Sequence, residues 1–213
     1  MRTPQVEGTK GSLKWIQTLI NEYPEVINQQ LAINNIEWLS PLVDDEYAEY
    51  RDAAFLDILG LSHLQSTLKG FWPKNGPQWD ALRRSGNKYF LVEAKANIPE
   101  ISSSCAAKNP KSVAMIERAI SDTKMSFGVT HGNGWLDGFY QYANRLAHLY
   151  FFRNICGVDA ELVFVYFCDD PTHISTSINE WELALSDQKT LMGLSKCDHT
   201  SELFISCQEL QQN

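Results

Sequence analysis

Several features that would assign a chain to a whole class of proteins are missing here. No window approaches the ~18 consecutive apolar residues that a membrane span requires, and no internal repeat or low-complexity segment is present. The segment from Met1 to Lys14 is polar and no apolar run follows it, so we expect no secretory signal. These absences predict a soluble, cytoplasmic protein without a membrane partner.

Cysteine is scarce and irregularly spaced. The sequence contains no C-x-x-C pair, which argues against a zinc ribbon and against a disulfide framework. We therefore expect reduced cysteines in or near the core. The five positions are Cys105, Cys156, Cys168, Cys197 and Cys207.

Positive charge is also in short supply. The chain has 18 lysine and arginine residues against 26 aspartate and glutamate residues, and its formal net charge is −8. Dedicated duplex-DNA binders usually have a basic footprint, so this composition argues against tight, non-specific DNA binding. It does not exclude nucleic acid, because charge can be segregated on one face and divalent metal offsets carboxylates.

Apolar residues, by contrast, are sufficient for a sizeable core. The chain has 213 residues, of which 44% are hydrophobic. That length suits one compact α/β domain with elaborations. We predict a single domain over residues 1–213, in which an N-terminal helical elaboration (1–39) and a C-terminal helix and tail (169–213) flank a core at 40–168.

Hydrophobic periodicity and the positions of Gly, Pro and capping residues predict the elements. Helices are expected at 12–22, 41–59, 112–127, 137–156 and 178–193. Strands are expected at 66–72, on both sides of a tight turn at Gly86-Asn87, and at 160–167. The segment after 196 is expected to be a strand or a loop.

The expected helix at 41–59 is acidic along one side. Asp45, Glu49 and Asp52 recur at i, i+4 and i+7, which would place them on one helix face. A solvated acidic surface is one interpretation of this pattern. An extra carboxylate for an active site is the other.

Two charged residues end an otherwise apolar strand at 89–96. Side chains alternate between the faces of a strand, so Leu91, Glu93 and Lys95 share one face. The strand begins apolar on both faces, which is typical of a central strand. A buried charge is costly unless it is paired or bound to metal. Glu93 and Lys95 therefore indicate either a functional site or an ordinary salt bridge at a strand end.

The tight turn predicts what faces Glu93. If Gly86 and Asn87 are the two turn residues, the numbers of paired residues sum to 173, and Asp80 lies opposite Glu93. Cross-strand neighbours have Cβ atoms ~4.5–5.5 Å apart. Two carboxylates that close do not both ionise unless a cation lies between them. The register therefore predicts a site for a cation such as Mg²⁺ or Mn²⁺, which prefer carboxylate oxygens.

These residues carry a family resemblance. Asp80, followed after thirteen residues by Glu93-Ala94-Lys95 at the end of an apolar strand, resembles the bipartite motif of the PD-(D/E)XK nuclease superfamily. The expected order of elements is similar to the αβββαβ core of that restriction-endonuclease-like fold, a mixed sheet flanked by helices. The resemblance covers residues 40–168, and its segments GPQWDAL, VEAKA and YQYANRLAHLYF resemble an uncharacterised bacterial group. The motif's proline is replaced by Trp79.

The resemblance implies a chemistry and a set of site residues. In that family the aspartate and the glutamate bind one or two divalent ions, Mg²⁺ or Mn²⁺, and the lysine orients or activates the attacking water. Carried over, Asp80 and Glu93 are metal ligands, the Ala94 carbonyl is a third candidate, and Lys95 is the catalytic lysine. The family often takes a further acid from its first core helix, and Glu49 is the candidate here.

A polar stripe runs along the expected helix at 137–156. Gln141, Asn144, Arg145 and His148 fall at i, i+3, i+4 and i+7 on a helix that is otherwise rich in Phe, Tyr, Leu and Ala. A helix that is apolar nearly all round is buried, so the stripe should face a polar cavity or an ion-pair partner. Family members commonly place such residues beside the site, which makes Gln141 and Arg145 candidates for phosphate contacts. Structural hydrogen bonds are the alternative.

The leading hypothesis is a divalent-metal-dependent nuclease, a phosphodiesterase that hydrolyses nucleic acid. The alternative is a catalytically silent protein of the same fold that binds nucleic acid or a protein partner, and the net charge of −8 favours it. A third is that the fold acts on a substrate other than nucleic acid. Since this fold often works as a dimer, a homodimer is a further expectation.

Overall fold

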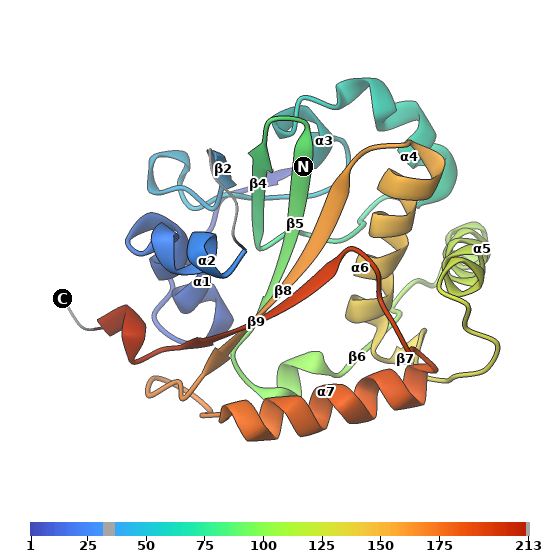
Figure 1. The fold of residues 1–213 in the computed structure, drawn as a ribbon. Helices are drawn as coiled ribbons and strands as arrows, with labels where there is room; N and C mark the ends of the chain where they lie inside the picture. Colours follow the sequence, from blue (N-terminus) through green and yellow to red (C-terminus); the bar gives the residue numbers. More distant parts are fainter. Residues whose placement is uncertain (32–36, 212–213) are drawn as a thin grey trace.

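A five-stranded mixed sheet forms the centre of the computed structural model, which describes residues 1–31 and 37–211 (Figure 1). Its strands, in spatial order, are β2 (Glu37–Ser40), β4 (Ala81–Ser85), β5 (Lys88–Lys95), β8 (Ala160–Cys168) and β9 (Thr200–Ser206). Strand β4 runs antiparallel to its neighbours β2 and β5, and β8 and β9 run parallel to β5. The predicted α/β class, with a mixed central sheet flanked by helices, is confirmed.

The middle strands are buried because both of their faces are apolar. Leu91 and Leu162 contribute to the core on one face, whereas Val92 and Val163 contribute to the core on the other. Parallel strands covered on both faces have this composition. The position of β5 between β4 and β8 makes it the most enclosed place in the sheet for a charged side chain.

Helices cover both faces of the sheet (Figure 1). On one face, α1 (Gly11–Asn21) and α2 (Pro24–Gln30) supply Trp15, Leu19 and Ile27 to the core. On the other face the core takes its apolar side chains from five helices. These are α3 (Ala53–Ile58), α4 (Gln65–Phe71), α5 (Pro110–Ser126), α6 (Tyr140–Tyr150) and α7 (Ile178–Met192).

Short elements complete the chain. Strand β1 (Arg2–Thr3) pairs with β3 (Glu49–Tyr50), and β6 (Ser103–Ser104) pairs with β7 (Asp137–Gly138). A π-helical turn continues α6. Its bounds are Phe151–Ile155, and the 3-10 turns lie at Val43–Asp45, Ser62–Leu64, Ile98–Ile101 and Glu209–Gln211.

The expected helix at 41–59 is wrong over most of its length. Residues 41–52 instead contain a 3-10 turn, two left-handed residues, Glu46 and Tyr47, and the strand β3; only α3 is helical. The reason is non-local, because β1 pairs with β3 and Arg2 forms ion pairs with Asp45 and Glu46. Tertiary contacts of this kind override a local helical pattern.

The expected strand at 66–72 is also wrong, because this segment is the helix α4. Leu64, Leu68 and Trp72 are buried at a spacing of four residues, which is a helical period. The first of the three antiparallel strands is instead β2. Part of the predicted N-terminal elaboration, 32–36, and the last two residues of the predicted tail lie outside the described residues.

The other expected elements are found, with small changes at their ends. The helices at 12–22, 112–127 and 178–193 correspond to α1, α5 and α7, and the strand at 160–167 is β8. The segment after 196 contains β9, which joins the central sheet. The five cysteines are free.

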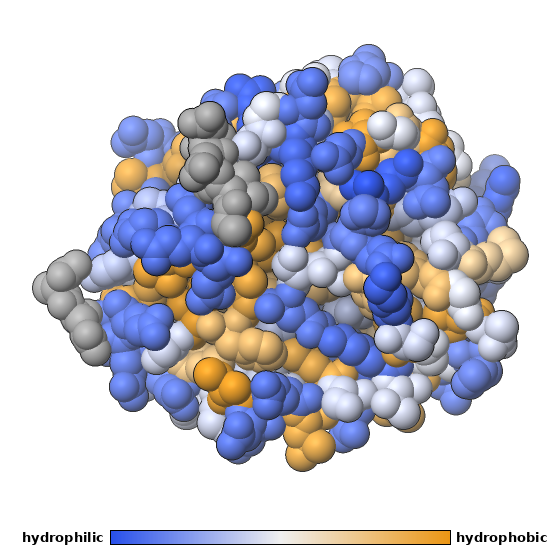
Figure 2. Space-filling view, in the orientation of Figure 1, coloured by the Kyte–Doolittle hydropathy of each residue, from blue (hydrophilic) through white to orange (hydrophobic). Residues whose placement is uncertain are grey.

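The surface mixes polar and apolar side chains. On the face shown in Figure 2, hydrophilic residues surround smaller hydrophobic areas. Large exposed apolar side chains come from separate elements, for example Val6, Met125 and Leu183. No helix within residues 1–31 and 37–211 is long and apolar enough to cross a membrane.

Candidate active site

The site is built on the hairpin of β4 and β5. Gly86, with φ of 56°, allows the tight turn, and the paired residues run from Ser85↔Lys88 to Ala81↔Val92, so their numbers sum to 173 as predicted. Asp80 directly precedes this ladder. Its Oδ2 accepts a hydrogen bond from the backbone N–H of Ala94 at 2.7 Å, which fixes the carboxylate beside the end of β5.

Glu93 is buried and held by two cations. Lys95 Nζ donates to its Oε1 at 2.7 Å, and Arg145 donates through Nε at 2.6 Å to Oε2, with Nη2 at 2.5 Å from the same oxygen. Glu93 is 3% exposed and Arg145 is 5% exposed, so water screens this contact little. Burial would raise the pKa of Glu93, but Arg145 and Lys95 bring it below its ordinary value.

Helix α6 brings two predicted residues to this carboxylate. Gln141 Oε1 accepts a hydrogen bond from Lys95 Nζ at 3.0 Å, and Arg145 lies one helical turn further on. The polar stripe therefore reaches the strand at these two positions. Further along, His148 makes its hydrogen bond to the backbone of Asn144 and lies among aromatic rings instead.

Glu49 reaches the site, but not from a helix. It is a residue of β3, 7% exposed, and it accepts hydrogen bonds from Gln78 and from Gln5. Burial raises the pKa of Glu49, the hydrogen bond from Gln78 opposes this, and the charge of Glu93 adds to the rise. The prediction that Asp45, Glu49 and Asp52 share a helix face is wrong. Asp45 pairs with Arg2, and Asp52 accepts from Gly76 N.

The charges of the cluster do not cancel. Asp80, Glu93 and Glu49 are three carboxylates, and Lys95 and Arg145 are two cations, so full ionisation leaves a net charge of −1. Burial, then the charges of Glu93 and Glu49, raise the pKa of Asp80 well above its ordinary value. Ionisation of Asp80 is therefore unfavourable in this cluster.

Lys95 stays positively charged in this environment. Burial lowers the pKa of a lysine, but the neighbouring carboxylates Glu93 and Asp80 outweigh burial and raise it above its ordinary value. An ammonium that holds its proton cannot act as a general base. It can stabilise negative charge that develops near its Nζ atom.

The donor set suits a divalent cation only as an open site. Among residues 1–31 and 37–211, no three His, Cys, Asp or Glu side chains converge closely enough to enclose a metal ion. Asp80, Glu93 and the Ala94 carbonyl supply the hard oxygen donors that Mg²⁺ and Mn²⁺ take, and Mg²⁺ commonly keeps several waters beside one or two carboxylates. Both oxygens of Glu93 already contact a cation, so an incoming metal ion must use a remaining lone pair or displace Lys95 or Arg145.

Gln78 and Glu100 support the site through hydrogen bonds. Gln78 donates to Glu49 and its carbonyl accepts from Arg145 Nη2 at 2.8 Å, so it ties two charged residues together. Glu100 accepts from Ala96 N at 3.0 Å and from Asn97 at 2.7 Å, which fixes the chain where β5 ends. The only sequence signal for Gln78 is its place two residues before Asp80.

Comparison of the chain with models of known protein families, with curated proteins and with solved structures gives no match.

Proposed function

We propose that the chain is a Mg²⁺- or Mn²⁺-dependent nuclease, a phosphodiesterase that acts on nucleic acid. The observation that carries the proposal is the placement of Asp80, whose carboxylate accepts from the Ala94 N–H beside the Glu93–Lys95 pair at the end of the central strand. A structural ion pair requires only Glu93 and its two cations. Two further carboxylates, Asp80 and Glu49, are unfavourable there unless another cation joins them.

Each residue has a role in this proposal. Asp80, Glu93 and the Ala94 carbonyl would hold the cation, with Glu49 as a further carboxylate behind them. The bound cation supplies Lewis-acid activation of water and offsets phosphate charge. Lys95 Nζ, positioned by Glu93 and Gln141, stabilises the charge that develops on the phosphate oxygens. Arg145 steadies Glu93 and, when a cation takes its place, becomes available for a bidentate contact with phosphate.

A panel of labelled DNA and RNA, single- and double-stranded, tests the proposal with Mg²⁺ or Mn²⁺. Wild type should cleave at least one substrate, and Lys95→Met should lower the rate by about 10²–10³-fold, as the loss of one electrostatic contact to a transition state does. Lys88→Met is the matched control, because Lys88 lies at the other end of β5 and pairs with Glu161. Absence of cleavage on every substrate by folded protein would overturn the proposal.

A catalytically silent binding protein is the second candidate, and one observation favours it. Glu93 already has a cation on each oxygen, so its charge is satisfied without metal. Calorimetric titration with Mn²⁺ separates the two candidates. Binding that Asp80→Asn abolishes supports the nuclease, whereas no heat at millimolar Mn²⁺ supports the silent protein.

A further inference from the structure

A pocket of about 330 Å³ opens beside the buried end of the polar stripe on α6. Its walls come from the start of α3, from α4 and from the segment that follows α4. Leu68 and Trp72 give it an apolar lining, His148 lies in its wall, and the exposed residues Lys69 and Lys74 also line it. It lies apart from the carboxylate cluster.

The tautomer of His148 is determined by its neighbour. Nδ1 lies 2.8 Å from the carbonyl oxygen of Asn144, and a carbonyl can only accept, so Nδ1 carries the proton. Burial lowers the pKa of His148 to about 3, and the ring is therefore neutral at physiological pH. It follows that Nε2 is a bare hydrogen-bond acceptor.

This acceptor points to the pocket and lacks a donor. A Cβ atom built on Gly76, another lining residue, would lie 3.6 Å from His148 Nε2. No side chain or backbone group in residues 1–31 and 37–211 donates a hydrogen bond to Nε2, although His148 is 1% exposed. Nε2 therefore offers an acceptor at the wall of the pocket, and a ligand that carries a donor can bind to it.

The lining of the pocket suits an aromatic ring. The Trp72 and His148 rings have centroids 5.0 Å apart and an interplanar angle of 64°, so they form an aromatic corner. A heterocycle stacked on an aromatic side chain gains about 1–3 kcal/mol. Lys69 and Lys74 add positive charge in a protein whose net charge is −8. Asp52, whose Oδ1 accepts from Gly76 N at 3.0 Å, closes one side.

The pocket is physically connected to the carboxylate cluster. Trp79 contacts both: Arg145 lies over its ring at 5.0 Å from the centroid, and the His148 ring centroid is 6.0 Å away. The chain between Gly76 and Asp80 spans at most ~14 Å. A nucleic-acid strand held at Asp80 would therefore have at most about this distance to span to reach Gly76 at the pocket.

We propose that this pocket holds one unstacked nucleobase of the nucleic-acid strand that the carboxylate cluster cleaves. The base carries an amino group that donates to His148 Nε2, and its ring stacks on Trp72. The proposal rests on the proposed nuclease function. Bases outside a duplex are commonly recognised by aromatic stacking and by hydrogen bonds to their edges. Adenine, cytosine and guanine carry such an amino group, and single-stranded nucleic acid is the substrate class that presents them unpaired.

Binding of adenosine monophosphate to the metal-free protein, measured by calorimetry, tests the proposal without requiring cleavage. Gly76→Ala places a methyl group in front of Nε2 and should weaken binding at least tenfold. The N6,N6-dimethyl analogue, which has no amino hydrogen, should also bind about tenfold more weakly to wild type, the loss of about one hydrogen bond. Equal binding by ribose 5-phosphate would overturn the proposal, because it would mean that the lysines hold phosphate alone.

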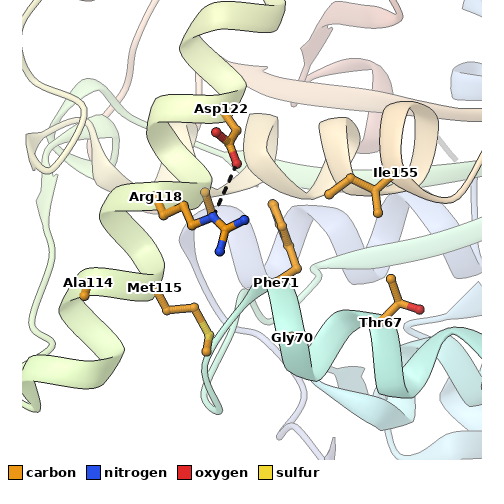
Figure 3. A pocket seen from close by; sticks show the side chains of 9 residues that line it. Thr67, Gly70, Phe71, Ala114, Met115, Arg118, Asp122 and Ile155 are labelled. Atoms are coloured by element: carbon orange, nitrogen blue, oxygen red, sulfur yellow. Dashed lines mark ion pairs between the residues drawn. The ribbon is translucent and has the colours of Figure 1, made fainter.

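Gly70→Ala is the matched control. Gly70 lines a different hollow of about 460 Å³, between α4, α5 and the π-helical turn, and a Cβ there meets nothing within 4 Å (Figure 3). Neither Trp72 nor His148 lines this hollow. Gly70→Ala should therefore bind the nucleotide as wild type does.

A second measurement covers the case in which Gly76→Ala fails to fold. On wild type, the nucleotide should shift the ¹⁵N resonance of His148 Nε2, and an unchanged resonance at saturation would overturn the proposal. The two proposals fail separately. Cleavage without nucleotide binding would overturn the base-binding proposal and leave the nuclease proposal, whereas nucleotide binding without cleavage would do the reverse.

Discussion

The two faces of the sheet each bury an arginine, and they treat it differently. Arg145, on the face covered by α6, forms two contacts with Glu93 and donates further hydrogen bonds to Asn144 and Gln78. Arg83, on the face covered by α1 and α2, is 0% exposed and lies over the rings of Phe90 and Trp38 at 4.3 and 5.0 Å. Its Nε and Nη2 make no hydrogen bond within the described part of the chain.

The charge of Arg145 is stabilised by a carboxylate, whereas the charge of Arg83 is stabilised mainly by aromatic rings. Burial lowers the pKa of Arg83 to about 10, with only partial compensation from Glu161. Arg145 belongs to a charge cluster in which the removal of one member leaves another buried without its partner. A buried arginine on its own therefore says little about function; the carboxylates around Arg145 are what distinguish its site.

The largest effect is expected from Arg145→Met. The change leaves Glu93 buried with Lys95 alone, and a buried pair that loses one partner typically costs about 3–5 kcal/mol of unfolding free energy. Urea unfolding measures the loss. The double variant Arg145→Met with Glu93→Leu is the control and should recover at least half of it. A double variant as unstable as the sum of the single variants would show that the pair is not a closed unit.

Lys95→Met should cost less, about 1.5–3 kcal/mol, the range for a hydrogen bond to a charged group. Glu93 keeps Arg145, and the lysine side chain is 14% exposed, so water replaces part of the contact. The same urea series ranks it against Arg145→Met. If Lys95→Met is the more destabilising of the two, Arg145 is not the principal partner of Glu93.

Asp80→Asn should stabilise the metal-free protein, by about 0.5–2 kcal/mol at pH 7–8. The folded pKa of Asp80 is raised, so between the unfolded and the folded values the folded state binds more protons, and stability falls as the pH rises. The penalty is complete above the folded pKa and absent below the unfolded one. The advantage of the variant should therefore shrink toward pH 4.

Thermal unfolding from pH 4 to pH 8 measures this advantage. Asp44→Asn, at an exposed carboxylate on the 3-10 turn, is the control and should show no such trend. A variant that is less stable than wild type at neutral pH would show that ionised Asp80 is favoured in the fold.

The smallest effect is expected from Arg83→Met, within about 1 kcal/mol of wild type. Replacing a buried charge by an apolar side chain of similar volume is often neutral or stabilising, and the lost ring contacts offset part of the gain. Urea unfolding beside Arg145→Met gives the comparison directly. A loss as large as that of Arg145→Met would show that the two arginines are equally dependent on their partners.

The hairpin and its charged end could be predicted from sequence because the information is local. The alternation in 89–96, the turn at Gly86-Asn87 and the i, i+4 spacing of Gln141 and Arg145 each involve a few neighbouring residues. These patterns lead to the ion pairs that Glu93 makes. What they cannot supply is which face of the sheet a helix covers.

Glu49 shows where local information ends. Its helical spacing with Asp45 and Asp52 is present in the sequence. However, β1 lies more than forty residues away and pairs with this segment as a strand, as in the pair Thr3↔Glu49. Glu49 reaches the cluster on a strand, and helical periodicity could not predict that. In the same way, α4 packs against residues far away in the sequence, because the rings of Phe71 and Trp72 contact the ring of His148.

The central position of β5 determines which parts of the molecule open locally. Amide protons in a strand hydrogen-bonded on both sides exchange with solvent mainly when the whole domain opens, whereas short helices and turns open locally at lower free energy. Glu93 and Lys95 thus lie on a strand of the first kind, between β4 and β8, and the pocket beside α4 is bounded by segments of the second kind. Access to that pocket can fluctuate on a fast timescale while Glu93 and Lys95 keep their backbone positions until the protein unfolds.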